Sequence, residues 1–498
     1  MRNIFTIITL LFFSSQITAQ DYSLTVNYGT GSGSYFYGDT VHVFSDKAPM
    51  IGVFTGWTGS GIDYLTIVDE WHTTLVLPSQ SGVDNLVLNA NYDQLPMGTP
   101  QSTEMISLFG EEGGTFMGNV MKEVHYVIPQ NPKGIVFLFH GTGGNGGNMF
   151  SKYEPFTLIK DLYYAGYGSI STDANERTLG DQDGDGKIRW AASQAIQQNF
   201  NNNIDLYNVR ALKDTLVVRY DLPDDFPFFS YGVSNGANFS DLAAAAVGFQ
   251  ASAHNTGNGS SSLYLHRPDA TPVIWLQALN DQNSSADPAA ALANYQALLD
   301  RGICSEWYWL DRSPLFEKRF MRSRIGINQQ ESTSIYKRFF DYPNLVGHDG
   351  FILVDNILSE LPNDFYTPLG LSNAQINDAE SQMKAVNADH GATGDFNKTI
   401  IRFFENNCLT TPVNFLPDSP LNISLFPNPT SDFVFLEANS ESLESATLFN
   451  LQGQVIKKYS FPKSTKKYEL NLSGIPSGIY FIKIKWDGGE ELKKVVFK

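Results

Sequence analysis

The chain has 498 residues, a length that predicts about three domains, and its 42% hydrophobic and 13% aromatic content is sufficient for packed cores. The formal net charge is −18; the segment from Leu421 onward carries ten Lys or Arg and eight Asp or Glu, so the first 420 residues carry −18 − 2 = −20. Such an acidic body repels nucleic-acid phosphates and anionic membranes, which excludes nucleic acid as a partner and favours a neutral or cationic substrate.

The first 19 residues have the pattern of a secretory signal peptide. Arg2 supplies positive charge, Ile4–Phe13 a short apolar core, and Ile17-Thr18-Ala19 a cleavage site. The ten residues of the apolar core cannot span a bilayer, which needs about 20, and no later stretch is long and apolar enough. The sequence therefore predicts an exported protein without an integral membrane segment.

Residues 21–95 combine alternating apolar and polar positions with turn glycines, a pattern that indicates short strands. The segments Gly31-Ser-Gly-Ser-Tyr35 and Phe54-Thr-Gly-Trp57 resemble the internalin-type B-repeat of bacterial surface proteins and secreted enzymes. The resemblance implies a small β-grasp-like module that contacts carbohydrate or a surface, or that serves as a spacer. Trp57 is either a binding platform or, as is more common for a lone Trp in a small module, part of the core.

From about Thr115 to Asn407, apolar strand patterns alternate with helical patterns. This alternation predicts an α/β domain with a doubly wound, mostly parallel sheet that binds ligands at the carboxyl ends of its strands. The expected strands are Val124–Ile128, Gly134–His140, Gly168–Thr172, the run into Ser234, Gln250–His254, Thr271–Leu279 and Ser305–Leu310, and the expected helices include Phe156–Tyr167, Val209–Tyr220, Pro288–Asp300 and Asn397–Asn407.

The stretch Gly232-Val-Ser-Asn-Gly236 stands between an apolar strand and an Ala-rich segment, in the order strand, sharp turn, helix. A serine on such a turn is lifted clear of the sheet, and the flanking glycines avoid collisions with the neighbouring strand and helix. The helix start also offers the backbone N–H of Asn235 to a developing oxyanion. This context favours Ser234 as a nucleophile over an incidental serine in a Gly-rich turn.

A second Gly-rich segment, His140-Gly-Thr-Gly-Gly-Asn-Gly-Gly147, follows a predicted strand, and the absence of a following Gly-Lys-Ser/Thr argues against a phosphate loop. This segment, the serine turn and their order resemble the α/β-hydrolases, particularly secreted esterases and polyester or feruloyl-ester hydrolases. The resemblance implies an α/β-hydrolase domain over residues 105–408. It also implies that Thr142 or Gly143 gives the second oxyanion-hole amide beside Asn235.

In the α/β-hydrolases the acid follows the nucleophile in the chain and precedes the histidine. Asp281 ends the apolar strand that begins at Thr271 and matches that acid. Asp287 is the alternative, but as the N-cap of the helix from Pro288 it already has a sufficient structural role.

His390 lies directly before the last predicted helix, where the family places its base. The other candidates fit less well, because His348 reads as a surface histidine and His140 precedes the nucleophile in the chain. The resemblance therefore implies a triad of Ser234, Asp281 and His390 that cleaves esters through an acyl-enzyme and needs no cofactor for catalysis.

Residues 311–384 separate the last predicted core strand from His390, although a bare fold needs only a few residues there. Helical patterns over Pro314–Arg324 and Ser332–Phe340 and many aromatic residues indicate an ordered lid over the site. The aromatic rings either suit an aromatic acyl group or a hydrophobic chain, or simply pack the insertion.

Asp181-Gln-Asp-Gly-Asp-Gly-Lys-Ile188 matches the first eight positions of a calcium loop, with Asp181, Asp183 and Asp185 as carboxylate ligands and Lys187 as a carbonyl ligand. Position 12 is Ala192 where a bidentate Glu is expected. Three close carboxylates repel one another unless a cation lies among them. The pattern fits a structural Ca²⁺ with a further ligand from elsewhere as well as it fits a solvated acidic turn.

The chain has two cysteines, Cys304 and Cys408, and in an exported protein the default expectation is one disulfide. Cys304 precedes a predicted strand and Cys408 ends a predicted helix, so the two could meet. Two free, buried thiols are the alternative.

A Pro-rich linker over residues 409–420 precedes a segment, 421–498, whose alternation and turns indicate a compact β-sandwich. Leu425-Phe-Pro-Asn-Pro-Thr-Ser-Asp432, Gly478-Ile-Tyr-Phe-Ile-Lys483 and the Lys-rich end closely resemble the type A C-terminal sorting domain of the type IX secretion system of Bacteroidota. The resemblance implies export by that machinery across the outer membrane, followed by release or surface attachment, often with loss of the domain.

These patterns lead to three hypotheses of different kinds. The first is a secreted serine hydrolase of carboxylic esters, of the polyester or plant-wall type, with either a polymer or a small ester as its substrate. The second is a serine peptidase of the same fold, although such enzymes often add a propeller, for which residues 21–95 are too few. The third is a non-catalytic surface or carbohydrate-binding protein, which gains support if Ser234 and His390 lie more than about 6 Å apart.

Overall fold

The structure is a computed structural model. It describes residues 21–36, 38–76, 85–96, 101–193, 200, 203–283, 286–406, 423–426, 430, 433–438, 443–450, 455–461, 467–476, 478–486 and 489–497. The predicted signal peptide (1–19), the predicted linker (409–420) and Cys408 lie outside these residues. The chain forms two compact units, Met1–Cys408 and Leu409–Lys498, and each is described by itself.

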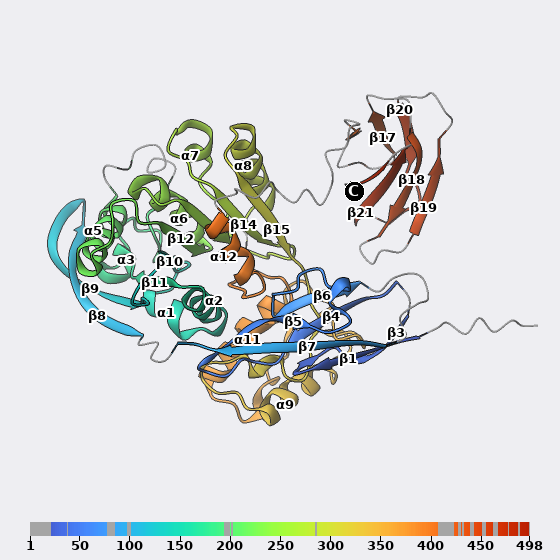
Figure 1. Cartoon of the computed structure of the whole chain (residues 1–498), viewed down its shortest axis with the longest axis horizontal. Helices are drawn as coiled ribbons and strands as arrows, with labels where there is room; N and C mark the ends of the chain where they lie inside the picture. The colour runs from blue at the N-terminus through green and yellow to red at the C-terminus, as the bar shows by residue number, and fades with distance from the viewer. Residues whose placement is uncertain are drawn as a thin grey trace, which may run out of the picture. The chain divides into compact units, whose positions relative to one another are not determined.

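An eight-stranded sheet forms the centre of the first unit, with the order β15-β14-β13-β12-β10-β11-β9-β8. Only β9 breaks the parallel arrangement, since it pairs antiparallel with both β8 and β11. This topology is that of the α/β-hydrolase fold (Figure 1). The strands are β8 (Ser102–Glu112), β9 (Thr115–Val127), β10 (Gly134–Phe139), β11 (Tyr167–Thr172), β12 (Phe228–Val233), β13 (Ala251–Asn255), β14 (Val273–Ala278) and β15 (Ser305–Leu310).

Helices cover both faces of this sheet, because successive side chains of its buried strands point to opposite sides. In β10, Phe137 and Phe139 belong to one hydrophobic core, and Val136 and Leu138 belong to the other. The first core is closed by α5 (Ile204–Tyr220), α6 (Asn235–Val247), α7 (Ser261–His266) and α8 (Pro288–Asp300), and the second by α1 (Gly146–Ser151), α2 (Tyr153–Tyr164) and α12 (Asn397–Asn406).

The N-terminal module consists of two small sheets, with the orders β3-β1-β7-β5 and β2-β4-β6. Trp57 belongs to its core, because the side chain is 3% exposed and its indole N–H donates to the carbonyl of Glu70 at 3.0 Å. The elements are β1 (Asp21–Asn27), β2 (Gly29–Thr30), β3 (Gly33–Phe36), β4 (Thr40–Ser45), β5 (Gly52–Thr58), η1 (Ile62–Tyr64), β6 (His72–Val76) and β7 (Asn85–Gln94).

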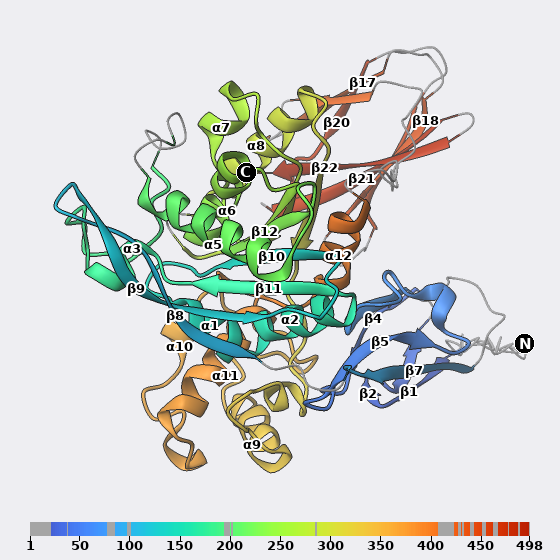
Figure 2. The same cartoon turned by 60° about the vertical axis from the view of Figure 1, so that its left-hand side comes forward.

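The insertion between β15 and His390 has a hydrophobic core of its own, which includes Phe320, Phe339 and Phe365. Figure 2 shows it in yellow and orange below the central sheet, where α9, α10 and α11 are labelled. The predicted helix over 314–324 is reduced to one short turn, because the N–H of Leu315 donates to the carbonyl of Gly350. The elements are η3 (Arg319–Met321), α9 (Gln329–Phe339), α10 (Ile357–Glu360), η4 (Thr367–Leu369) and α11 (Asn373–Val386).

The C-terminal unit is a sandwich of two antiparallel sheets, as the sequence predicts. Val434 and Leu436 from one sheet and Leu448 and Ile482 from the other are fully buried in a shared core. One sheet contains β16 (Ile423–Phe426), β17 (Phe433–Ala438) and β20 (Lys467–Asn471), and the other contains β18 (Leu443–Phe449), β19 (Val455–Ser460), β21 (Gly478–Trp486) and β22 (Gly489–Phe497).

Two further features concern export and redox state. Among the described residues, none of the helices has the length and apolarity needed to cross a membrane. Cys304 is disulfide-bonded, and its expected partner, Cys408, lies outside the described residues.

His254 on β13 gives a prediction about acid stability. Its side chain is fully buried, and neither ring nitrogen has a hydrogen-bond partner. Burial lowers the pKa of His254 to about 3, whereas the unfolded chain binds that proton near pH 6.5. Stability contributed by the neutral ring is therefore present above pH 6.5 and is lost as the pH falls towards 3, by about 1.4 kcal/mol per pH unit.

A Leu at position 254 cannot take up a proton, so we expect His254→Leu to lose less stability than the parent between pH 7 and pH 4. Urea unfolding at several pH values measures the difference. Asp241, whose pKa burial raises to about 7, lies near His254 and is present in both proteins. Parallel stability curves for the two proteins would contradict the prediction.

Candidate active site

Ser234 lies on the sharp turn between β12 and α6, with a positive φ of 58° and ψ of −122°. A non-glycine residue in this region costs of order 1–3 kcal/mol and persists only where its surroundings hold it. Here the N–H of Ser234 donates to the carbonyl of Asn255, and the carbonyl of Ser234 accepts from Ala237 and Asn238. The strained turn lifts the hydroxyl away from the sheet.

The two glycines of the turn are required by close backbone approach. A Cβ on Gly232 would lie 2.0 Å from the carbonyl oxygen of Gly236, and a Cβ on Gly236 would lie 2.3 Å from that of Phe139. No Cβ occupies such positions, so a side chain at either residue would push α6 away from the sheet. The occurrence of glycine at both positions 232 and 236 thus has a steric cause.

Ser234, His390 and Asp281 lie in one hydrogen-bonded row. The Ser234 Oγ is 2.7 Å from the His390 Nε2, and the His390 Nδ1 is 2.8 Å from the Asp281 Oδ2. Since an ionised carboxylate only accepts, the Nδ1–H donates to Asp281, and Nε2 is left to accept the serine proton. The Asp281 side chain is 1% exposed and the imidazole 16% exposed. The arrangement can take a proton from the serine hydroxyl and stabilise the imidazolium that forms.

The loops that carry the acid and the histidine are tied to each other. The Asp389 carboxylate accepts from the backbone N–H of His390 and of Gln282, and the N–H of Asn280 donates to the carbonyl of Ala388. The Asp281 carboxylate also accepts from the N–H of Asn283 at 2.9 Å. These bonds keep the acid and the base at a constant separation.

The alternative residues have other roles in the structure. Asp287 caps α8 by accepting from the N–H groups of its first turn, and His348 is exposed on the insertion. His140 is buried; its Nδ1–H donates to the carbonyl of Gly141 and its Nε2 accepts from Ala174. Burial lowers the pKa of His140 to about 4, so the ring is neutral and structural at neutral pH.

Of the three predicted oxyanion donors, Asn235, Thr142 and Gly143, the structure leaves two. Asn235 is the first residue of α6, and Thr142 lines the same cavity as Ser234. Gly143 does not fit as a donor, because its N–H already donates to the carbonyl of Ile188 at 2.7 Å. The loop lies close to the nucleophile, since a Cβ on Gly141 would be 3.3 Å from the Cβ of Ser234. Thr142 and Asn235 therefore remain as the two candidates.

A cavity of about 270 Å³ opens beside the serine and the histidine. Its described lining is mostly polar, and Ala286 is the only side chain in it that is wholly hydrocarbon. Polar and charged groups are contributed by Thr142, Lys187, Arg189, Asn238, Asn258 and Asn283. None of the described residues in 311–384 lines the cavity, so the prediction of a lid over the site is not supported. Phe320, Phe339 and Phe365 pack the insertion's own core instead, and Phe316 packs on the N-terminal module.

The segment that bears Lys187 and Arg189 reaches the cavity through contacts that the sequence does not reveal. The Asn235 side chain accepts from the N–H of Trp190 and donates to its carbonyl, at 2.8 and 3.3 Å. The indole N–H of Trp190 donates to the carbonyl of His140. Trp190 thus joins the serine turn to the glycine-rich loop. Its side chain is buried, and the local sequence around it does not indicate these contacts.

The acidic loop lies next to this segment. Carboxylate oxygens of Glu176, Asp181 and Asp183 lie within 4.8 Å of one another. Glu176 comes from α3 (Asn175–Leu179) and is a candidate for the ligand that the sequence motif lacks. Arg189 competes with a cation, because its guanidinium lies 3.2 Å from Asp183 and 2.5 Å from Asp185. The three carboxylates therefore favour a bound cation, whereas the guanidinium of Arg189 opposes one.

Among solved structures, the chain is similar to a bacterial esterase (13% identity over 44% of this chain and 89% of that one, TM-score 0.30) and to a dienelactone hydrolase from Anabaena variabilis (16%, 48% and 97%, TM-score 0.29). It is also similar to acetyl xylan esterase 1 from Thermoanaerobacterium sp. (14%, 42% and 80%, TM-score 0.26). These identities and TM-scores are too low to carry an argument, so the fold assignment rests on the strand order of the central sheet.

A search of curated proteins found no match. Residues 424–498, in contrast, match the family model of the secretion system C-terminal sorting domain. The C-terminal unit therefore matches the sorting domains of the Bacteroidota type IX secretion system, and this match indicates a protein that this machinery exports to be released or held at the cell surface.

Proposed function

We propose that the protein is an exported serine hydrolase that cleaves carboxylic esters through an acyl-enzyme. The observation that carries the proposal is the continuous row of hydrogen bonds from Ser234 through His390 to Asp281, at 2.7 and 2.8 Å. The non-catalytic alternative would gain support if Ser234 and His390 lay more than about 6 Å apart, and the 2.7 Å between the Ser234 Oγ and the His390 Nε2 argues against it.

The reaction follows from the roles of these groups. The Ser234 Oγ attacks the ester carbonyl carbon while the His390 Nε2 takes the hydroxyl proton, and Asp281 stabilises the imidazolium. The backbone N–H groups of Asn235 and Thr142 stabilise the tetrahedral oxyanion. The imidazolium returns its proton to the leaving alcohol as the carbon–oxygen bond breaks. Water, deprotonated by the same ring, then attacks the acyl-enzyme and releases the acid.

The polar lining supports an ester that is rich in hydroxyl or other polar groups. Asn238, Asn258 and Asn283 offer amide donors and acceptors, and Lys187 adds a positive charge at the cavity. Among the described lining residues there is no Phe, Tyr or Trp ring to stack on a feruloyl group or on an aromatic polyester. A small acyl group on a carbohydrate, as in an acetylated plant-wall polymer, suits this lining better than a polyester.

Covalent labelling together with a substrate panel tests the proposal. A fluorophosphonate probe should phosphonylate Ser234, with loss of fluoride, and the modified peptide can be identified by mass spectrometry. p-Nitrophenyl acetate and acetylated oligosaccharides should be hydrolysed, whereas peptide p-nitroanilides should not. Cleavage of the anilides with similar efficiency would support the peptidase alternative, and the absence of both labelling and turnover would overturn the proposal.

We also propose that the Asp181–Asp185 loop binds a structural Ca²⁺, with Glu176, Asp181 and Asp183 as carboxylate ligands. A bound cation would relieve the repulsion among these carboxylates. We expect millimolar Ca²⁺ to raise the melting temperature of the parent protein and to leave that of Asp181→Asn unchanged. Equal melting temperatures of the parent in Ca²⁺ and in EDTA would show that the loop binds no calcium.

Residues 21–95 are proposed to be an internalin-type B-repeat module. Contacts between this module and the rest of the first unit argue against a plain spacer. Glu70 accepts from the backbone N–H and the hydroxyl of Thr399, and Phe44 stacks on Phe316 with ring centroids 4.3 Å apart.

A further inference from the structure

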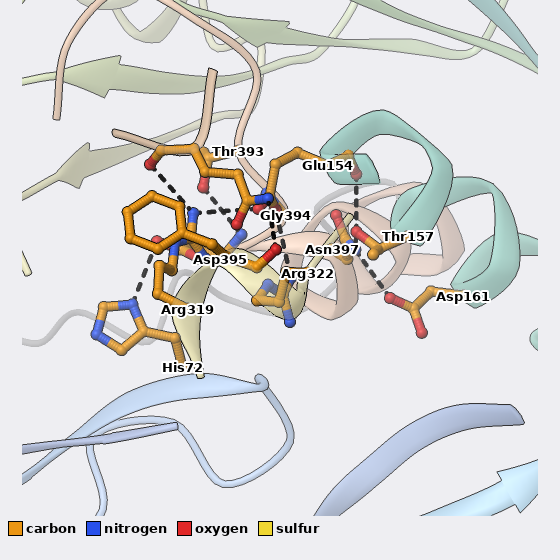
Figure 3. Close-up of polar contacts among 12 residues, drawn as sticks. His72, Glu154, Thr157, Asp161, Arg319, Arg322, Thr393, Gly394, Asp395 and Asn397 are labelled. Atoms are coloured by element: carbon orange, nitrogen blue, oxygen red, sulfur yellow. Dashed lines mark hydrogen bonds and ion pairs between the residues drawn. The ribbon is translucent and has the colours of Figure 1, made fainter. Parts of the chain in front are cut away.

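The loop that carries His390 continues through Thr393, Gly394 and Asp395 into α12, and a cluster of charged side chains holds this continuation (Figure 3). The cluster draws on three separate parts of the chain. His72 comes from the N-terminal module, Glu154 from α2, and two arginines from the insertion. None of these side chains belongs to the triad or to the described lining of the active-site cavity.

Glu154 is the centre of the cluster. Its carboxylate lies 3.1 Å from Arg319 and 3.3 Å from Arg322, and it accepts from the backbone N–H of Gly394 at 3.0 Å. All three charged side chains are 3–5% exposed. The loop cannot move away from Glu154 without leaving a buried N–H and a buried carboxylate oxygen short of a partner, which is costly. A Cβ on Gly394 would also lie 2.9 Å from Glu154 and 2.5 Å from Thr157.

Asp395 is held from the other side by the N-terminal module. The His72 Nδ1 lies 3.2 Å from the Asp395 Oδ2, and the His72 Nε2 lies 3.0 Å from the His42 Nδ1. Burial, followed by the neighbouring His72, lowers the pKa of His42 to about 3, so His42 is neutral. Phe44 stacks on the His72 ring with centroids 4.4 Å apart. The ring of His72 is therefore fixed in the orientation that donates to Asp395.

The cluster is balanced in charge. Two carboxylates, Glu154 and Asp395, face two guanidinium groups, Arg319 and Arg322, and the Arg322 guanidinium also lies 3.3 Å from the centroid of the Trp71 ring. Burial by itself would raise the pKa of Asp395, but the hydrogen bond and proximity of His72 and the charges of Arg319 and Arg322 hold it below its usual value. Asp395 is therefore an anion at neutral pH and accepts a strong hydrogen bond from His72.

We propose that His72, Glu154 and Asp395 are positioning residues for His390, so that the N-terminal module completes the active site instead of merely preceding it. This inference rests on the proposed function. The side of the loop nearer the triad is fixed by Asn255, which in the orientation that satisfies its neighbours donates to Gly391 and accepts from Thr393. The cluster fixes the opposite side, and a displacement of about 1 Å in a catalytic group can cost 10²-fold in rate.

The test uses the full-length protein with p-nitrophenyl acetate and the fluorophosphonate probe. His72→Leu removes the donor to Asp395, and His72→Asn restores one, since the amide nitrogen occupies the place of Nδ1. We expect His72→Leu to lower kcat and the phosphonylation rate by about tenfold with KM within about twofold, and His72→Asn to stay within about threefold of the parent. Lys318→Met is the matched control, because it removes a different contact of the N-terminal module, the ion pair of Asp46 with Lys318 of the insertion, which does not touch the loop.

Melting temperatures measured on every variant separate positioning from folding. If His72→Leu fails to fold, Asp395→Asn takes its place, since the amide keeps the shape and removes the charge that receives the His72 proton. A parent-like kcat in folded His72→Leu or Asp395→Asn overturns the inference, and so does an equal loss in Lys318→Met. Such a result leaves the proposed function standing, because that depends on labelling and turnover by the parent protein.

Discussion

Replacing Ser234 with Ala is expected to lower the kcat of ester hydrolysis by about 10⁶-fold, because removal of the nucleophile from a triad costs about as much as removal of the whole triad. The substitution removes one oxygen atom and keeps the Cβ, so the strained turn and the packing of Gly232 against Gly236 are preserved. The melting temperature should stay close to that of the parent. Steady-state kinetics with p-nitrophenyl acetate measures the loss.

Ser261→Ala is a suitable control, because Ser261 is an exposed serine at the start of α7. It should have parent kinetics and should still be labelled by the fluorophosphonate. Asp281→Asn should lower kcat by about 10⁴-fold, since the amide no longer holds the tautomer that accepts the serine proton. Turnover by pure, folded Ser234→Ala at more than about a hundredth of the parent rate would mean that another group is the nucleophile.

The second large effect concerns stability. Replacing Glu154 with Leu is expected to destabilise the first unit by about 3–5 kcal/mol, because removal of one partner from a buried ion pair leaves an uncompensated charge. Arg319 and Arg322 would both lose their carboxylate, and the N–H of Gly394 would lose its acceptor. Urea unfolding, followed by the fluorescence of the tryptophans, measures the change.

The double variant Glu154→Leu/Arg319→Met distinguishes charge balance from simple loss of contacts. It leaves one guanidinium, on Arg322, opposite one carboxylate, on Asp395, so the cluster stays neutral. We therefore expect the double variant to be more stable than the single variant, although it has lost more hydrogen bonds. A double variant that is less stable than Glu154→Leu would show that the individual contacts outweigh the charge balance.

Much of the fold and the members of the candidate triad follow from local sequence. The strand ending at Val233, the glycines at 232 and 236 and the helix that begins at Asn235 are neighbours in the chain, and the steric demand of the turn acts only on them. Asp281, at the end of a strand, and His390, before the last helix, were selected because the α/β-hydrolases that the chain resembles place their acid and base there. The sorting domain is likewise marked by contiguous motifs. The nucleophile turn and the sorting-domain motifs can be found in a single sequence because each depends on residues that are close together in the chain.

Other features depend on which distant segments pair. The edge strand β8 was not predicted, since its residues become a strand only through the antiparallel partner β9. The lid prediction assumed that an insertion before His390 must cover the cavity, but the insertion packs on its own core and on the N-terminal module. Gly143 could be excluded as an oxyanion donor only after its N–H was seen to bond Ile188.

The sequence by itself determined most strands and helices of the central sheet, the nucleophile turn and the export tail, because neighbouring residues decide each of them. Only the tertiary structure decided what lines the cavity and what holds the histidine loop. His72 and Asp395 are separated by 323 positions in the chain, and no local pattern records that they meet. Their contact exists because a buried carboxylate is stable only beside the donors and cations that the folded chain brings to it.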